Sequence, residues 1–304
     1  WYPGAGLYRN VHLIITEDAY IPVWGTYITT PSVNEKFAKV NVRTKVVLPE
    51  GADPAKYSVE TSVWNPNKQK LTAVRTSLAQ MKYNNNQAEQ EFVIQAPSLW
   101  SPEMPALYSA ETRLYEGDKL KDIYTTPFGI RSIEIIPDKG FFLNGKRTVF
   151  KGVCNHHDLG PLGAAVNDAA IRRQIRILKD MGCNAIRTSH NMPAPELIRA
   201  CDEMGMMIMA ESFDEWNVAK CKNGYNLLFD EWAEKDLVNL LHNFRNNPSV
   251  VMWCIGNEVP NQWNEGDCKI AKWLQDICHR EDPTRPVTCG MDQVTCVLAN
   301  GFAA

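Results

Sequence analysis

The stretch Val250-Val251-Met252-Trp253-Cys254-Ile255-Gly256-Asn257-Glu258 decides the fold class, because a long apolar run leads directly into a polar end. Such a run is typical of a parallel strand that is buried on both faces. Other apolar runs precede and follow it, and amphipathic stretches separate them. This alternation predicts an α/β domain, either a (β/α)8 barrel or an open sheet. The predicted strands are 148–153, 184–188, 206–211, 250–255 and 286–290, and the predicted helices are 168–181, 195–204, 230–245 and 269–279.

The residues before this domain have a different rhythm. From about residue 35 to 135, short segments alternate polar and apolar residues, and turn signals such as Pro49-Glu50-Gly51 separate them. Alternation with period two predicts antiparallel strands, and their spacing favours an immunoglobulin-like β-sandwich. Residues 7–16 are also strand-like. The predicted sandwich strands are 38–48, 57–64, 91–95, 107–115 and 122–128.

The composition excludes several classes of protein. The chain has 304 residues, of which 44% are hydrophobic and 22% are charged, as in ordinary globular proteins. A net charge of −3 provides no basic surface for nucleic acid or for a membrane. The apolar runs are far shorter than the ~18 residues that a spanning helix needs. The nine cysteines begin at Cys154 and form no CxxC pair, which indicates free structural thiols.

Polar side chains follow each predicted strand of the α/β half. The carboxyl ends of parallel strands meet at one edge, where α/β enzymes carry their sites. No glycine-rich phosphate loop follows a strand, which argues against a nucleotide cofactor. A rim with carboxylates and aromatic side chains favours sugar chemistry, in which a positioned acid protonates a glycosidic oxygen. The candidates at the strand ends are His156, His157, Arg187, His190, Glu211, Trp216, Asn257, Glu258 and Asp292.

Glu258 is the strongest candidate for an acid. A carboxylate directly after an apolar strand and beside an amide can be desolvated enough to stay protonated near neutral pH. Glu211 could instead only support other site residues, and Arg187 could be a structural ion-pair partner. A metal site formed by the histidines at 156–157 with Asp158 is disfavoured, because no third ligand follows at ligand spacing.

The motifs along the chain occur in a distinctive order. Residues 1–11 (WYPGAGLYRNV) come first, followed by 141–146 (FFLNGK), 184–190 (NAIRTSH) and 253–258 (WCIGNE). Together they resemble the family 2 glycoside hydrolases, which include the β-galactosidases and β-glucuronidases. The resemblance implies the C-terminal tail of a jelly-roll sugar-binding domain at 1–20 and an immunoglobulin-like β-sandwich at 21–135. It also implies the N-terminal part of a TIM (β/α)8 catalytic barrel at 136–304.

The resemblance implies a retaining double displacement that uses two glutamates. Glu258 is then the general acid/base, and Asn257 binds the sugar 2-hydroxyl. In this family the nucleophile follows strand 7, which the strand spacing of about 34 residues places near residue ~358. The chain is therefore expected to be an inactive fragment, with about five barrel strands. The other substrate-binding positions that the resemblance implies are His190, His156, Arg187 and Trp216.

The resemblance is compatible with more than one substrate. The parent enzyme is expected to hydrolyse terminal β-D-galactosides, with a β-glucuronidase or another family 2 β-glycosidase as the alternative. A second alternative is a non-catalytic carbohydrate-binding or interaction protein. The expected partner is a β-linked sugar or oligosaccharide, with no nucleic acid and no membrane. Open barrel edges also predict self-association, or disorder near residues 290–304.

No cofactor is expected, because the histidine that some members use for magnesium is missing after Glu215-Trp216-Asn217. A divalent metal such as Mg²⁺ is left open for a longer parent protein. The resemblance favours a periplasmic or secreted location, whereas free cysteines favour the cytoplasm.

Overall fold

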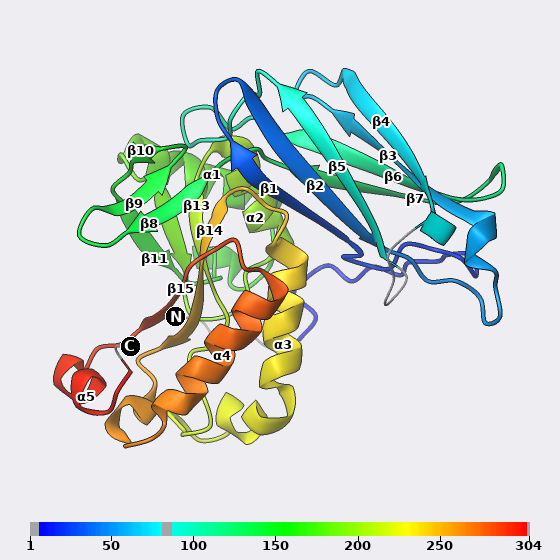
Figure 1. Ribbon diagram of the computed structural model, residues 1–304. Helices are drawn as coiled ribbons and strands as arrows, with labels where there is room; N and C mark the ends of the chain where they lie inside the picture. The colour runs from blue at the N-terminus through cyan, green and yellow to red at the C-terminus, as the bar shows by residue number, and fades with distance from the viewer. Residues whose placement is uncertain (1–5, 81–86, 303–304) are drawn as a thin grey trace. The chain divides into compact units, whose positions relative to one another are not determined.

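The computed structural model describes residues 6–80 and 87–302, which form two compact units (Figure 1). The β unit comprises Val11–Thr148 and Arg245–Pro248. The α/β unit comprises Val149–Phe244, the residues from Ser249 onward, and the segment that ends at Asn10.

The β unit is a sandwich of two antiparallel sheets, as the alternating pattern predicted. Its inner faces pack on each other, with buried Val40 and Phe92 on one sheet and Val63 and Phe128 on the other. One sheet has the order β1 (Thr26–Val33), β2 (Phe37–Lys45), β5 (Gln87–Gln95). The other has the order β4 (Lys70–Ser77), β3 (Tyr57–Trp64), β6 (Tyr108–Glu116), β7 (Lys119–Phe128).

A third antiparallel sheet also belongs to the β unit. It consists of β8 (Ile133–Ile136), β9 (Gly140–Leu143) and β10 (Lys146–Arg147), in the order β10-β9-β8. The alternating sequence pattern did not predict β1 and β4. Most side chains of β4 are exposed or half-buried, so this strand shows no apolar alternation.

The α/β unit contains a five-stranded parallel sheet, and its strands lie side by side in chain order (Figure 1). They are β11 (Gly152–Asn155), β12 (Ala185–Thr188), β13 (Met207–Glu211), β14 (Val250–Asn257) and β15 (Val287–Gly290). The helices are α1 (Asp168–Asp180), α2 (Pro195–Met204), α3 (Phe229–Phe244), α4 (Cys268–Glu281) and α5 (Val294–Ala299). Short 3-10 turns are Pro54–Lys56, Leu78–Gln80, Gly160–Leu162, Tyr225–Leu227 and Pro260–Trp263. This arrangement confirms the predicted immunoglobulin-like sandwich followed by part of a TIM barrel.

Local signals explain why the helices begin and end where they do. The side chain of Asn167 accepts the N–H of Ala170 at the start of α1, which satisfies one of the free donors of its first turn. Helix α2 opens on Pro195 and ends at Gly205, whose φ of 73° lies in the left-handed region that favours glycine. Among the described residues, no helix is long and apolar enough to cross a bilayer.

The N-terminal segment departs from its prediction. Residues 7–16 form no strand, and Leu13 and Ile15 are exposed. Instead, the guanidinium of Arg9 donates to the carbonyl of Met192 at 2.8 Å and to that of Pro193 at 3.3 Å. These bonds explain why the segment up to Asn10 joins the α/β unit.

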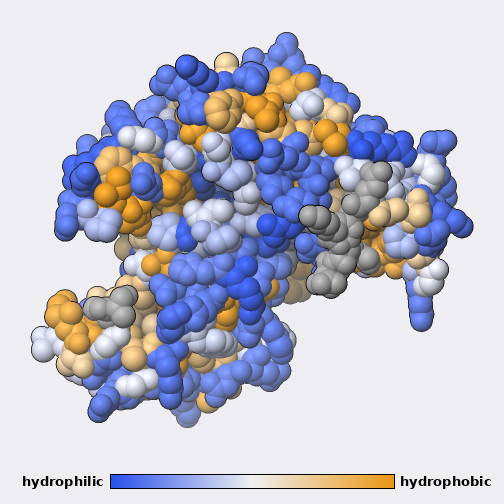
Figure 2. Space-filling view, viewed as in Figure 1, coloured by the Kyte–Doolittle hydropathy of each residue, from blue (hydrophilic) through white to orange (hydrophobic). Residues whose placement is uncertain are grey.

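Strands β11 and β15 form the two edges of the parallel sheet among the described residues, as predicted. Within residues 290–302, Val294–Ala299 form helix α5. Helix α5 carries an apolar surface, which is orange at the lower left of Figure 2. Val294 and Leu298 on this helix are 69% and 65% exposed.

Candidate active site

The carboxyl ends of the parallel strands bring most of the predicted site residues together. Arg187 lies near the end of β12, Glu211 ends β13, and Asn257 ends β14. The strand register places Arg187 opposite Met209 and Glu211 opposite Cys254, so these ends lie at the same edge of the sheet. His190 lies two residues after the end of β12.

Glu211 is the centre of this network. Its side chain is fully buried, and its backbone N–H donates to the Thr188 hydroxyl at 3.0 Å. The Arg187 guanidinium forms a two-point ion pair with it, with Nε 2.8 Å from Oε2 and Nη2 2.9 Å from Oε1. Nδ1 of His190 lies 3.1 Å from Oε1. Glu211 therefore fixes the positions of both Arg187 and His190.

Asn257 is connected to the same network through its side chain. Its Oδ1 accepts Nη2 of Arg187 at 2.9 Å, and its Nδ2 donates to Asp214 at 3.0 Å. Since a guanidinium only donates and a carboxylate oxygen accepts, these two partners define the orientation of the amide. Asn257 is thus held in one orientation at the end of β14.

Burial and neighbouring charges shift the pKa values of Glu211, Arg187 and His190. Burial raises the pKa of Glu211 to about 8, although the charge of Arg187 acts in the opposite direction. Burial lowers the pKa of Arg187, but the charge of Glu211 more than compensates, and the guanidinium stays charged. Burial, together with the nearby charge of Arg187, lowers the pKa of His190 to about 4. His190 is therefore neutral at pH 7 and can donate from Nδ1 to Glu211.

Gly290, at the end of β15, is required by close packing against this network. A Cβ at this position would overlap the guanidinium of Arg187. The carbonyl of Gly290 also accepts the backbone N–H of Glu258 at 2.5 Å. The lack of a side chain lets Arg187 reach both Glu211 and Asn257.

Glu258 directly follows β14, as predicted, but its environment differs from the prediction. Its side chain is exposed, whereas the sequence predicted a desolvated carboxyl. Its φ of 44° lies in the left-handed region, which is rare for a residue with a side chain and is common at active sites. The apolar strand that precedes Glu258 ends at Asn257, so the expected burial does not extend to the next residue.

Trp216, for which the resemblance implies a substrate-binding role, does not lie at an open surface. It is fully buried, and its indole N–H donates to the carbonyl of Ile255 at 2.8 Å. Its ring stacks on Phe302, with ring centroids 6.4 Å apart. In this structure Trp216 supports β14 from within the core. Phe302 lies far away in the sequence, so no local pattern could reveal this contact.

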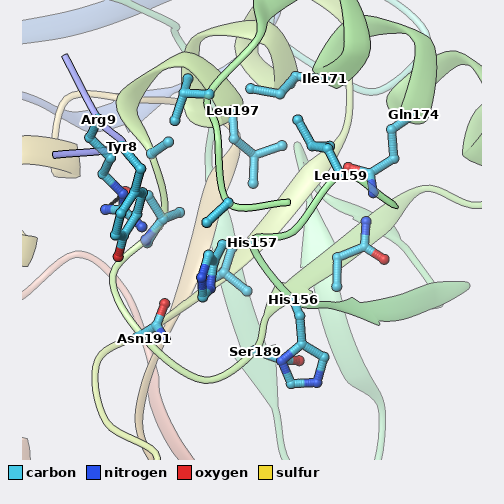
Figure 3. Close-up of a pocket in the computed structure, with 16 residues that line it drawn as sticks. Tyr8, Arg9, His156, His157, Leu159, Ile171, Gln174, Ser189, Asn191 and Leu197 are labelled. Atoms are coloured by element: carbon cyan, nitrogen blue, oxygen red, sulfur yellow. Dashed lines mark hydrogen bonds between the residues drawn. The ribbon is translucent and has the colours of Figure 1, made fainter. Parts of the chain in front are cut away.

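His156 lies beside the network, with its ring packed edge-on against His190 at a centroid distance of 5.2 Å. It also lines a cavity that Figure 3 shows, in which His157 lies next to Tyr8. The cavity volume of about 40 Å³ holds water molecules but no sugar ring. The other wall of the cavity is apolar and includes Leu159, Ile171 and Leu197.

The residues after β13 do not fit a divalent metal. Among the described residues, no cluster of three or more His, Cys, Asp and Glu side chains could hold a metal ion. The carboxylate of Glu215 accepts the backbone N–H groups of Lys220 at 2.7 Å and Asn226 at 3.0 Å. Asp214 accepts the Lys220 ammonium at 3.0 Å. These oxygens are already engaged by groups of the chain itself.

The sequence missed part of this site. Glu211 was expected at most to support other site residues, yet it contacts both Arg187 and His190. The strand-end pattern did not point to Asp214 or Lys220 as site residues. Asp214 lies close to the end of β13 and could have been found by its position, but Lys220 lies deeper in the following loop, where the strand-end rule gives no signal.

Parallel strands whose carboxyl ends carry a network of charged side chains define a barrel-type α/β enzyme domain. A model of the TIM barrel domain of glycosyl hydrolases family 2 matches residues 134–302, and a second model of glycosyl hydrolases family 2 matches residues 20–131. The chain therefore belongs to the family 2 glycosyl hydrolases.

Similar proteins carry the names of two activities. The chain is 39% identical to the β-galactosidase BoGH2A of Bacteroides ovatus over 96% of its own length and 38% of that protein. It is 34% identical to a putative β-glucuronidase of Formosa agariphila over 95% of its length and 26% of that protein. A family 2 glycosyl hydrolase structure from Bacteroides cellulosilyticus matches with a TM-score of 0.90 and 36% identity, over 99% of this chain and 39% of that one. The chain thus spans well under half the length of these relatives.

Proposed function

We propose that the protein to which these residues belong is a retaining glycoside hydrolase, with Glu258 as its general acid/base. The observation that carries this proposal is the network of Arg187, Glu211 and Asn257, which fixes the strand end immediately before Glu258. Asn257 would bind the sugar 2-hydroxyl from that position. His190 and His156 would contact the sugar beside it.

Glu211 is not the nucleophile in this proposal. It is fully buried, and both of its carboxylate oxygens are engaged by Arg187 and His190. A nucleophile needs an oxygen that can reach the anomeric carbon from within about 5–5.5 Å of the acid/base carboxyl. Glu211 instead positions Arg187 and His190, and a different carboxylate supplies the covalent step.

The proposed substrate is a terminal β-D-galactoside rather than a β-glucuronide. A glucuronide carries a carboxylate, which needs a cation in the sugar pocket. The cations of the described site, Arg187 and Lys220, are already paired with Glu211 and Asp214. A site whose cations already have partners within the chain suits a neutral sugar. The β-galactosidase name of the relative at 39% identity agrees with this choice.

The test compares two substrates on the product of the longest open reading frame that contains these residues. We expect kcat/KM for p-nitrophenyl β-D-galactoside to exceed that for the β-D-glucuronide by about 10²-fold. The 304-residue polypeptide alone is expected to show no turnover, since Glu211 cannot serve as the second carboxylate. A preference for the glucuronide would contradict the proposed substrate, and turnover by the isolated polypeptide would contradict the assignment of Glu211.

We also propose that these 304 residues, when produced alone, associate with a second copy through the β15 edge. Exposed Val294 and Leu298 belong to α5, which follows β15 in the chain, and a cavity of about 720 Å³ is lined by Cys289 of β15 together with Ile255 and Phe302. Unpaired strands and apolar patches of this kind promote association. Sedimentation is expected to show a dimer that Leu298→Asp converts to a monomer. Leu227→Asp, at an equally exposed leucine, should leave the dimer intact; a monomeric unmodified chain would disprove the proposal.

A further inference from the structure

Lys220 holds an unusual position at the end of the parallel sheet. Its ammonium donates to Oδ1 of Asp214 at 3.0 Å and to the main-chain carbonyl of Asn257 at 2.6 Å. Its own backbone N–H donates to Glu215 at 2.7 Å. The side chain is 23% exposed, so the charge is partly shielded from water. A cation therefore lies against the residue that directly precedes Glu258.

The contacts of Lys220 form a closed loop around Asn257. Asp214 uses the same oxygen, Oδ1, to accept both the Lys220 ammonium and Nδ2 of Asn257. Lys220 thus binds the main chain of Asn257 directly and its side chain through Asp214. Since the amide oxygen of Asn257 is held by Arg187, the strand end is fixed from two sides.

Three carboxylates follow one another at the end of β13, namely Glu211, Asp214 and Glu215. Carboxylates in such a group are the usual ligands of a divalent cation. Here each is already paired: Glu211 with Arg187, Asp214 with Lys220, and Glu215 with backbone N–H groups. Arg187 and Lys220 therefore supply the positive charge that would otherwise come from a metal ion bound by these carboxylates.

We propose that Lys220 is a positioning residue that provides the fixed cation of this site and holds the Asn257–Glu258 corner, so that the enzyme needs no divalent metal. This inference rests on the proposed glycosidase function. An ammonium has three N–H donors, of which Asp214 and the Asn257 carbonyl take two. The charge also acts on its neighbours: burial is the main cause of the low pKa of His190, and Lys220 contributes in the same direction.

The kinetic test uses variants of the product of the longest open reading frame. Lys220→Ala is expected to lower kcat by about tenfold to a hundredfold and to change KM less. The reason is that the end of β14 loses the contacts of the Lys220 ammonium with Asp214 and with the Asn257 carbonyl. Lys220→Arg should retain more activity than Lys220→Ala, and added ethylammonium should restore part of the activity of Lys220→Ala. Lys222→Ala, at an exposed lysine in the same loop, is the control and should match the unmodified enzyme.

The metal arm of the test treats the unmodified enzyme with EDTA, which should leave kcat unchanged. Loss of activity in EDTA and its return with Mg²⁺ would overturn the proposal, as would an unchanged kcat in Lys220→Ala. A third measurement needs no activity: the side-chain amide signals of Asn257 in an NMR spectrum of the 304-residue chain should shift in Lys220→Ala but not in Lys222→Ala. If the unmodified enzyme hydrolyses no glycoside, the proposed function fails. The side-chain amide signals of Asn257 still show whether Lys220 positions this residue.

Discussion

Replacing Glu258 by Gln in the product of the longest open reading frame should lower kcat for an aryl β-galactoside by about 10²–10⁴-fold. Glutamine keeps the size of the side chain but cannot give a proton to the glycosidic oxygen. The exposed position of Glu258 makes this substitution mild for folding, so a loss of activity reports on chemistry. The left-handed φ of 44° at this residue is unchanged by the substitution, because both side chains branch in the same way.

The leaving group distinguishes acid catalysis from a structural effect. A dinitrophenyl galactoside releases a weakly basic phenolate that needs little protonation, so its first step should lose much less than that of a phenyl galactoside. Glu265→Gln is the matched control, because Glu265 is an exposed glutamate in the same region after β14. An equal loss for both substrates, or full activity in Glu258→Gln, would remove Glu258 from the mechanism.

Apolar runs predicted most of the α/β unit, because strands β12, β13 and β14 are largely buried. Helix α2 matches its predicted range, since Pro195 and Gly205 mark its two ends. Residues 7–16 were mispredicted, because alternation alone does not show whether a neighbouring strand is available. Strand β4 was missed for the opposite reason: it pairs with β3 although most of its side chains are not buried.

The candidate site was predictable where strand ends determine it. Arg187, His190 and Asn257 were found in this way, because a parallel sheet brings its carboxyl ends together. The burial of Trp216 depends on Phe302, and the exposure of Glu258 depends on how the chain turns after β14. Lys220 reaches Asn257 from a loop with no regular pattern. Contacts between residues far apart in the sequence therefore account for what the sequence did not reveal.

The ion pair of Arg187 and Glu211 leads to the second large prediction, which concerns stability. At pH 9, where Glu211 is ionised, Arg187→Met should lower the free energy of unfolding of the 304-residue chain by about 3–5 kcal/mol, because it leaves the fully buried carboxylate of Glu211 without its charged partner. Urea denaturation measures this loss. Arg176→Met, at an exposed arginine of α1, is the control and should change stability by less than about 0.5 kcal/mol.

The loss in Arg187→Met should depend on pH, because Glu211 can take up a proton. Its pKa in the folded protein is about 8, above the ordinary value of 4.5, so its contribution is fully present below about pH 4.5 and is lost as the pH rises through 8. Without Arg187 the pKa rises further. The variant should therefore lose the least free energy of unfolding near pH 5 and the most near pH 9.

A double variant is the control for this pH dependence. Adding Glu211→Gln removes the buried charge, so the double variant should regain stability at high pH and lose the pH dependence. A loss that is equal at both pH values would show that packing of the arginine side chain, rather than its charge, stabilises this end of the sheet.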